Sequence, residues 1–151
     1  MHVRKTLLSV LLSIVFVSPA ASQEPGPQRQ TFRLPAMAAL NLPFSDAVLV
    51  GNTLYLSGSG GIDPATMSVP EDPKDEVRLL MENFVKTLAM AQMTLDDLVS
   101  VTVYCTDLSL YGAFNEVYAS YFTGEFPARA FIGSGPLLFG MRFEMQAIAV
   151  K

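Results

Sequence analysis

The most constraining feature of the sequence is an apolar stripe at helical spacing over residues 72–91. Asp72 supplies an N-cap side chain, and Pro73 occupies the first helical position, where its missing N–H costs nothing. The stripe consists of Val77, Leu80, Met81, Phe84, Leu88 and Ala91. A helix of about five turns must bury such a face against another layer of secondary structure.

Extended segments surround this helix and supply that layer. Residues 46–50 and 53–57 predict a hairpin around Gly51-Asn52, and further strands are predicted over 95–105, 128–132 and 141–150. A second amphipathic helix is predicted over 110–121, with an apolar face of Leu110, Phe114, Val117, Tyr118 and Tyr121. The order β-β-α-β-α-β-β predicts an α+β fold with both helices on one face of a mixed sheet. The bare sheet face favours burial against other subunits.

The first 35 residues differ in character from the rest. Residues 1–22 have a basic start, an apolar run over 7–17 and a small-residue end, the pattern of a secretory signal peptide. The apolar run is shorter than the roughly 20 residues that a membrane-spanning helix needs. Residues 23–35 are predicted to be a flexible leader and 36–151 a single domain, which suits a chain of 151 residues. We therefore expect export to the periplasm or the exterior.

The net charge and the few histidine and cysteine residues limit which partners the protein can bind and which catalytic mechanisms it can use. Cleavage after residue 22 leaves eight basic and fourteen acidic residues with no basic stripe, so we expect neither nucleic acid nor an anionic membrane as partner. The only histidine, His2, is lost with the signal segment, which removes imidazole-dependent catalysis and most zinc sites. Cys105 alternates with Val101 and Val103 and is predicted to be a buried free thiol.

Two charged side chains interrupt apolar strands and are the candidates for chemistry. Glu144 lies on the polar face of the last strand, opposite an apolar face of Met141, Phe143, Met145, Ala147 and Ala149. Arg129 lies inside the run 127–132, and a guanidinium grips a carboxylate through two parallel N–H bonds. From the residues alone two interpretations stay open: surface or mutual ion pairs, or a site in which Arg129 binds a small carboxylate and Glu144 orders a water molecule.

The glycine-rich segment 57–61 invites a phosphate-loop interpretation. The lysine and hydroxyl residue that complete a phosphate loop do not follow it, and Ile62-Asp63-Pro64 does not open a helix. We therefore predict a tight turn at the edge of a pocket.

Several short motifs follow one another from about residue 40 to the C-terminus. They are Ser57-Gly58 followed by Asp63-Pro64, then residues 95–99, 101–103, 106–108, 114–118, 121–122, 126–129 and 144–149. In these motifs and in their order the chain resembles the RidA/YjgF family of imine deaminases.

The resemblance implies a chorismate-mutase-like fold, a homotrimer with sites between subunits, and hydrolysis of small 2-imino acids to 2-oxo acids and ammonia without metal or cofactor. By motif, Arg129 corresponds to the residue that binds the substrate carboxylate and Glu144 to the one that positions water. The resemblance also assigns a substrate contact to the Phe131 backbone N–H and pocket-lining positions to Ser57 and Asn115. A purely structural role is the alternative for Asn115.

Two departures from the family pattern indicate an altered substrate preference or reduced activity. Phe44 stands in the pocket where many active members have tyrosine, and the loop 135–140 is longer and more apolar than usual. Phe44 and the export signal favour, as an alternative, a non-catalytic trimer that binds small carboxylates or a protein partner.

Overall fold

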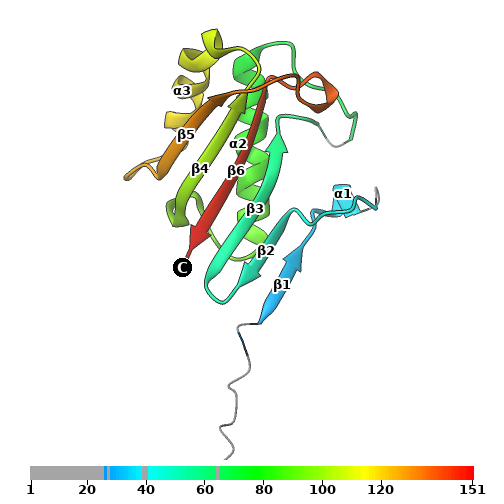
Figure 1. Ribbon diagram of the computed structural model, residues 1–151, viewed down its shortest axis with the longest axis vertical. Helices are drawn as coiled ribbons and strands as arrows, with labels where there is room; N and C mark the ends of the chain where they lie inside the picture. The colour runs from blue at the N-terminus through cyan, green and yellow to red at the C-terminus, as the bar shows by residue number, and fades with distance from the viewer. Residues whose placement is uncertain (1–25, 27, 39–40, 64) are drawn as a thin grey trace, which may run out of the picture.

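The computed structural model describes residues 26, 28–38, 41–63 and 65–151, so the predicted signal segment lies outside the described residues. One mixed sheet is backed by two long helices (Figure 1). Its strands are β1 (Arg29–Phe32), β2 (Ala47–Val50), β3 (Thr53–Gly60), β4 (Leu98–Cys105), β5 (Ala128–Gly133) and β6 (Phe143–Val150). The helices are α1 (Pro35–Ala38), α2 (Pro73–Met90) and α3 (Tyr111–Ser120), with single 3₁₀ turns at Leu95–Asp97, Leu108–Leu110 and Leu138–Gly140.

The six strands are ordered β1-β2-β3-β6-β4-β5 across the sheet. Neighbouring strands are antiparallel except for the pair β4 and β5, which is parallel, as a connection through α3 requires. The last strand, β6, is therefore central, and β5 is an edge strand. Both α2 and α3 lie on the same side of the sheet (Figure 1), which confirms the predicted α+β fold class.

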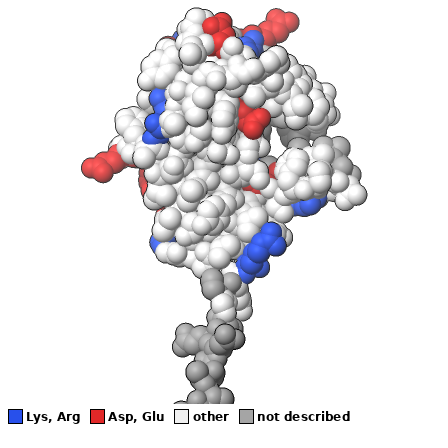
Figure 2. Space-filling model, viewed as in Figure 1, with Lys and Arg blue, Asp and Glu red and all other residues white. Residues whose placement is uncertain are grey.

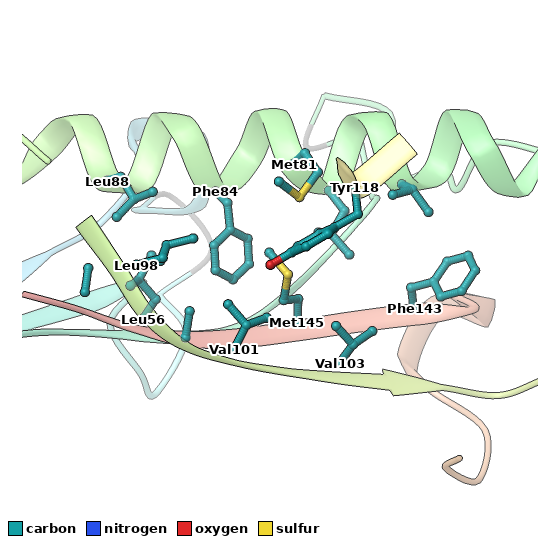
Figure 3. Close-up of a cluster of buried hydrophobic side chains, with 14 of the residues drawn as sticks. Leu56, Met81, Phe84, Leu88, Leu98, Val101, Val103, Tyr118, Phe143 and Met145 are labelled. Atoms are coloured by element: carbon teal, nitrogen blue, oxygen red, sulfur yellow. The ribbon is translucent and has the colours of Figure 1, made fainter. Parts of the chain in front are cut away.

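The core lies between α2 and the sheet. The six predicted stripe residues of the helix are all buried, and so is the predicted apolar face of β6 from Phe143 onward. Figure 3 shows Met81 and Phe84 of α2 directed toward Met145 and Val101 on the strands, and Leu88 of α2 above Leu98. The Asp72 carboxylate caps α2 by accepting from Lys74 N at 2.7 Å.

The sequence-based boundaries were wrong in three places. Residues 29–32, inside the predicted flexible leader, form β1 and pair with β2. Without β1, the backbone N–H and C=O groups along the outer edge of β2 would be unpaired. Residues 95–97 form a 3₁₀ turn and not the start of a strand. The glycine-rich segment is no tight turn either, since β3 continues to Gly60 with a register shift between Leu56 and Ser59.

Cys105 is fully buried beside Val101 and Val103, as predicted. Its Sγ donates to the Asp107 carbonyl at 3.0 Å, and burial raises the pKa of the thiol. A thiol of this kind is a poor nucleophile at neutral pH. No helix in the described part of the chain combines the length and hydropathy needed to cross a membrane.

Candidate active site

A cavity of about 480 Å³ opens at one end of the sheet, between β3, β6 and the segment that carries α1. Figure 2 shows the molecule hollowed in this region, beside the α1 segment. Phe44, which is 47% exposed, and Glu144 both contribute to its lining. The size falls within the range of about 300–1,000 Å³ that small-molecule sites occupy.

Glu144 stands on the sheet face that the helices leave uncovered. Its neighbours along the strand, Phe143 and Met145, are buried in the core, so the alternation of β6 directs Glu144 to the opposite side. Among the described residues its carboxylate has no hydrogen bond and no salt bridge, and it is half-buried. The surface ion pair considered for Glu144 is therefore not formed within one protomer.

Gly58 makes room for this carboxylate. A Cβ atom built on Gly58 would overlap Oε1 of Glu144, because the two residues lie on adjacent strands next to the register shift. Any larger residue here would displace the Glu144 carboxylate, so the glycine matters because of this close approach and not because of an unusual backbone angle.

Arg129 lies on the edge strand β5 and packs against α3. Its guanidinium donates to Asn115 Oδ1 at 2.5 Å and stands over the Tyr118 ring, 4.6 Å from the centroid. The Phe114 and Phe131 rings lie 5.6 and 5.8 Å away. Cation–π contacts and one amide hold the guanidinium in place while leaving N–H groups free for an anion. The ion pair between Arg129 and Glu144, which the sequence left open as an alternative, is not formed within the protomer.

The positive charge of Arg129 affects the pKa values of two tyrosines on α3, Tyr111 and Tyr118. Burial raises the pKa of Tyr118, and the guanidinium opposes this rise. A hydrogen bond from Asn115 lowers the pKa of Tyr111, and the Arg129 charge acts in the same direction. The Tyr118 hydroxyl is buried without a hydrogen-bond partner in the described residues. The positive charge of Arg129 thus acts to lower the pKa of both tyrosines.

Arg129 and Glu144 lie on opposite faces of the sheet. Arg129 pairs with Val101 of β4, whose side chain is buried under the helices, whereas Glu144 pairs with Tyr104 on the other face. Two strand spacings and three residues along the strand separate their Cα atoms by about 14 Å. One protomer therefore cannot present both groups to a single three- or four-carbon acid.

The other predicted site residues divide between these two places. Asn115 and Phe131 belong with Arg129, and Phe131 contacts the rings of Tyr111 and Phe114 at centroid distances of 5.0 and 5.2 Å. Phe44 belongs with Glu144 in the cavity. Ser57 does not line the cavity: its Oγ donates to the Ser45 carbonyl at 2.6 Å, while its neighbours Gly58 and Ser59 do line it.

Two features of the site were missed by sequence reasoning. Tyr118 was assigned only to the apolar face of a helix, yet its ring supports Arg129. Glu76 of α2 is fully buried and accepts from Nε of Arg142 at 2.6 Å, from Arg142 N at 2.7 Å and from Phe143 N at 3.1 Å. This ion pair anchors the start of β6, two residues before Glu144. A glutamate inside an apolar stripe was the available signal.

Comparison with known proteins bears on the same residues. The family model described as Endoribonuclease L-PSP matches residues 35–151, a span that contains every candidate site residue. The chain belongs to this family. This is the RidA/YjgF family that the motifs indicate.

Two named relatives and one ligand complex illustrate the likeness. A 2-iminobutanoate/2-iminopropanoate deaminase of Mus musculus is 37% identical over 110 residues, covering 72% of this chain and 82% of the relative. The crystal structure of RidA from an Antarctic Psychrobacter is 31% identical, with a TM-score of 0.71, and covers 85% of this chain and 100% of the other. Escherichia coli TdcF with bound serine is 27% identical, with a TM-score of 0.71, over 85% and 99% of the two chains.

Proposed function

We propose that this protein hydrolyses 2-imino acids to 2-oxo acids and ammonia, at sites built between the protomers of a homotrimer. The observation that carries the proposal is the Glu144 carboxylate, which has no hydrogen-bond partner among the described residues and stands in the wall of a ligand-sized cavity. A free carboxylate beside such a cavity is placed to hold and deprotonate water. Relatives named 2-iminobutanoate/2-iminopropanoate deaminase support the same reaction class.

Each reacting group has a defined part in this scheme. Arg129 binds the substrate carboxylate through two N–H groups, and the Phe131 backbone N–H on the edge strand adds a further donor. Glu144 accepts a proton from water as the water oxygen attacks the protonated imine carbon. Glu144 then returns that proton to the amine nitrogen. The C–N bond then breaks, ammonia leaves with the bonding electron pair, and Glu144 accepts the hydroxyl proton and passes it to the ammonia. The products are the 2-oxo acid and ammonium.

The assembly follows from the distance between the two groups. Because Arg129 and Glu144 lie on opposite faces of one sheet, a shared substrate requires Arg129 of one protomer and Glu144 of another. The uncovered face of the sheet exposes large apolar side chains, including Tyr55 at 49% and Ile132 at 43%, which favours burial against a second protomer. A closed ring of three such contacts is the arrangement typical of the family.

The purified protein is expected to accelerate ammonia release from 2-iminopropanoate and 2-iminobutanoate generated in situ by an amino-acid oxidase. Glu144→Gln keeps the shape of the side chain but removes the base, so kcat should fall by about 10²–10⁴-fold. The matched control is Glu82→Gln, an exposed glutamate on α2 that does not line the cavity. A wild-type rate equal to that of buffer would refute the proposed reaction.

Gly58→Ala is expected to lower kcat by about 100-fold with little change in stability. The added methyl group would overlap the Glu144 carboxylate, which is the mobile end of a side chain and moves aside, and a misplacement of about 1 Å can cost that much. Gly112→Ala serves as the control, because a Cβ at Gly112 meets no atom within 4 Å. Equal activity of the two alanine variants would show that the position of Glu144 is immaterial.

A carboxylate-binding protein without turnover is the second candidate, and Phe44 favours it. This residue brings no hydroxyl to the cavity wall, where many active relatives carry tyrosine. Isothermal titration with pyruvate distinguishes the candidates when combined with the hydrolysis assay. Binding that depends on Arg129 without hydrolysis of any 2-imino acid would favour the binding protein.

A further inference from the structure

The cavity beside Glu144 is far more apolar than a three-carbon acid requires. Its walls include Leu34, Phe44, Ile62, Met67, Leu138 and Phe139. The imine derived from alanine carries a single methyl group beyond its reacting atoms. In a cavity of about 480 Å³, an imine of that size would leave most of the apolar wall without van der Waals contacts.

Two of the five polar side chains in the lining, Asp46 and Asn83, are hydrogen-bonded within the fold. The Asp46 carboxylate accepts from Leu34 N at 2.7 Å. The Asn83 amide donates to the carbonyls of Gly60 and Ile62, each at 3.3 Å. The charged groups that remain are Glu144 and Lys86, which is exposed on α2. The interior of the cavity is therefore apolar, with the reactive carboxylate on one wall.

Two of these apolar side chains, Leu138 and Phe139, belong to the loop after β5, and the loop places them there at a conformational cost. Leu138 is 71% exposed and Phe139 is 63% exposed, and Phe139 has a φ of 57°, which is unfavourable for a side chain of this kind. Gly140, with φ of 73°, completes the turn. Both side chains line the cavity, so a ligand bound there would cover apolar surface that the protomer leaves exposed.

We propose that the substrates of this site are 2-imino acids with bulky apolar side chains, derived from amino acids such as leucine, methionine or phenylalanine. This inference rests on the proposed function and specifies its substrate class. The side chain enters the cavity between Phe44 and the Leu138–Phe139 loop, and the imine carbon stays at its mouth, beside Glu144. The partner protomer's arginine holds the carboxylate outside the apolar region.

The test compares kcat/KM for imines generated by an amino-acid oxidase from leucine, phenylalanine and alanine. The leucine- and phenylalanine-derived imines should be preferred by at least about tenfold, since each additional methylene in a matched pocket contributes a factor of this order. Phe139→Gly should lower that ratio by at least about tenfold. Glycine adopts the φ of residue 139 more readily than phenylalanine, so the variant should fold at least as well as the wild type. Val85→Ser, which changes an exposed apolar residue of α2 outside the cavity, is the control.

The outcomes separate this inference from the proposed function. Hydrolysis of the alanine-derived imine with equal or lower kcat/KM for the bulky ones would overturn the inference and leave the deaminase standing. Absence of turnover for every imine would overturn the deaminase. In that case calorimetry with 4-methyl-2-oxopentanoate and pyruvate decides: tighter binding of the former, weakened by Phe139→Gly, supports the apolar pocket, and any other result rejects it. A changed oligomeric state of Phe139→Gly in light scattering would instead assign the loop to a subunit contact and reject the inference.

Discussion

Arg129→Ala is expected to reduce kcat/KM for 2-imino acids by about 30- to 5,000-fold. Losing one partner of a hydrogen-bonded charge pair costs about 2–5 kcal/mol, and each 1.4 kcal/mol corresponds to a factor of about ten. The aromatic surroundings make a lysine a poor substitute, because only the planar guanidinium both stacks on Tyr118 and presents two parallel donors. Arg129→Lys should therefore recover only a small part of the activity.

The control for this prediction is Arg78→Ala. Arg78 is an exposed arginine of α2, paired with Asp75, and it does not line the cavity. Its loss should leave kcat/KM within about twofold, since exposed ion pairs contribute little. Full activity in Arg129→Ala, in a protein whose circular dichroism matches the wild type, would remove the arginine from the mechanism.

Mixing two inactive variants tests the composite site directly. In the proposed trimer, co-expressed from Arg129→Ala and Glu144→Gln chains, each site would take one group from each of two protomers. Random assembly leaves both groups intact in about one quarter of the sites, so about one quarter of the wild-type activity should return. If both groups came from the same protomer, no mixed assembly would contain an intact site, and the activity would stay at the level of the separate variants.

The elements that sequence periodicity could predict are those with one buried face. The stripe of α2 and the alternation of β6 each sort side chains over several turns or strand positions, and both match the structure. The hairpin was predictable because Gly51, with φ of 60°, stands at a turn that few other residues adopt. Residues 29–32 escaped prediction, since an edge strand with three exposed residues has almost no apolar pattern.

The candidate site was predictable in its residues but not in its geometry. Arg129 and Glu144 were selected because a charged side chain within an apolar strand is unfavourable unless it has a partner or a function. Their placement on opposite faces depends on the register of β4 with both neighbours, which no local pattern encodes. The support of Arg129 by Tyr118 likewise joins residues of two separate elements. The site is therefore a property of tertiary structure, and in our proposal of quaternary structure.

Glu76→Ala is expected to lower the free energy of unfolding by about 3–5 kcal/mol, the cost of breaking a buried ion pair by removing one partner. The carboxylate is fully buried and accepts from the Arg142 side chain and from two backbone N–H groups at the start of β6. Its loss leaves these donors without acceptors. The Arg142 guanidinium, which also donates to the carbonyls of Pro70 and Glu71, would lose its only salt-bridge partner among the described residues.

The measurement is thermal and chemical unfolding of Glu76→Ala, Glu76→Gln and Glu82→Ala. For a chain of this size the alanine variant should melt roughly 10–15 °C below the wild type. The glutamine variant should lie between the two, because its amide oxygen can still accept from one backbone N–H while its NH₂ group opposes the arginine. Glu82→Ala, an exposed change on the same helix, should stay within about 0.5 kcal/mol. A Glu76→Ala protein as stable as the Glu82→Ala control would mean that the contacts between α2 and β6 are replaced at no cost, which the enclosed position of Glu76 argues against.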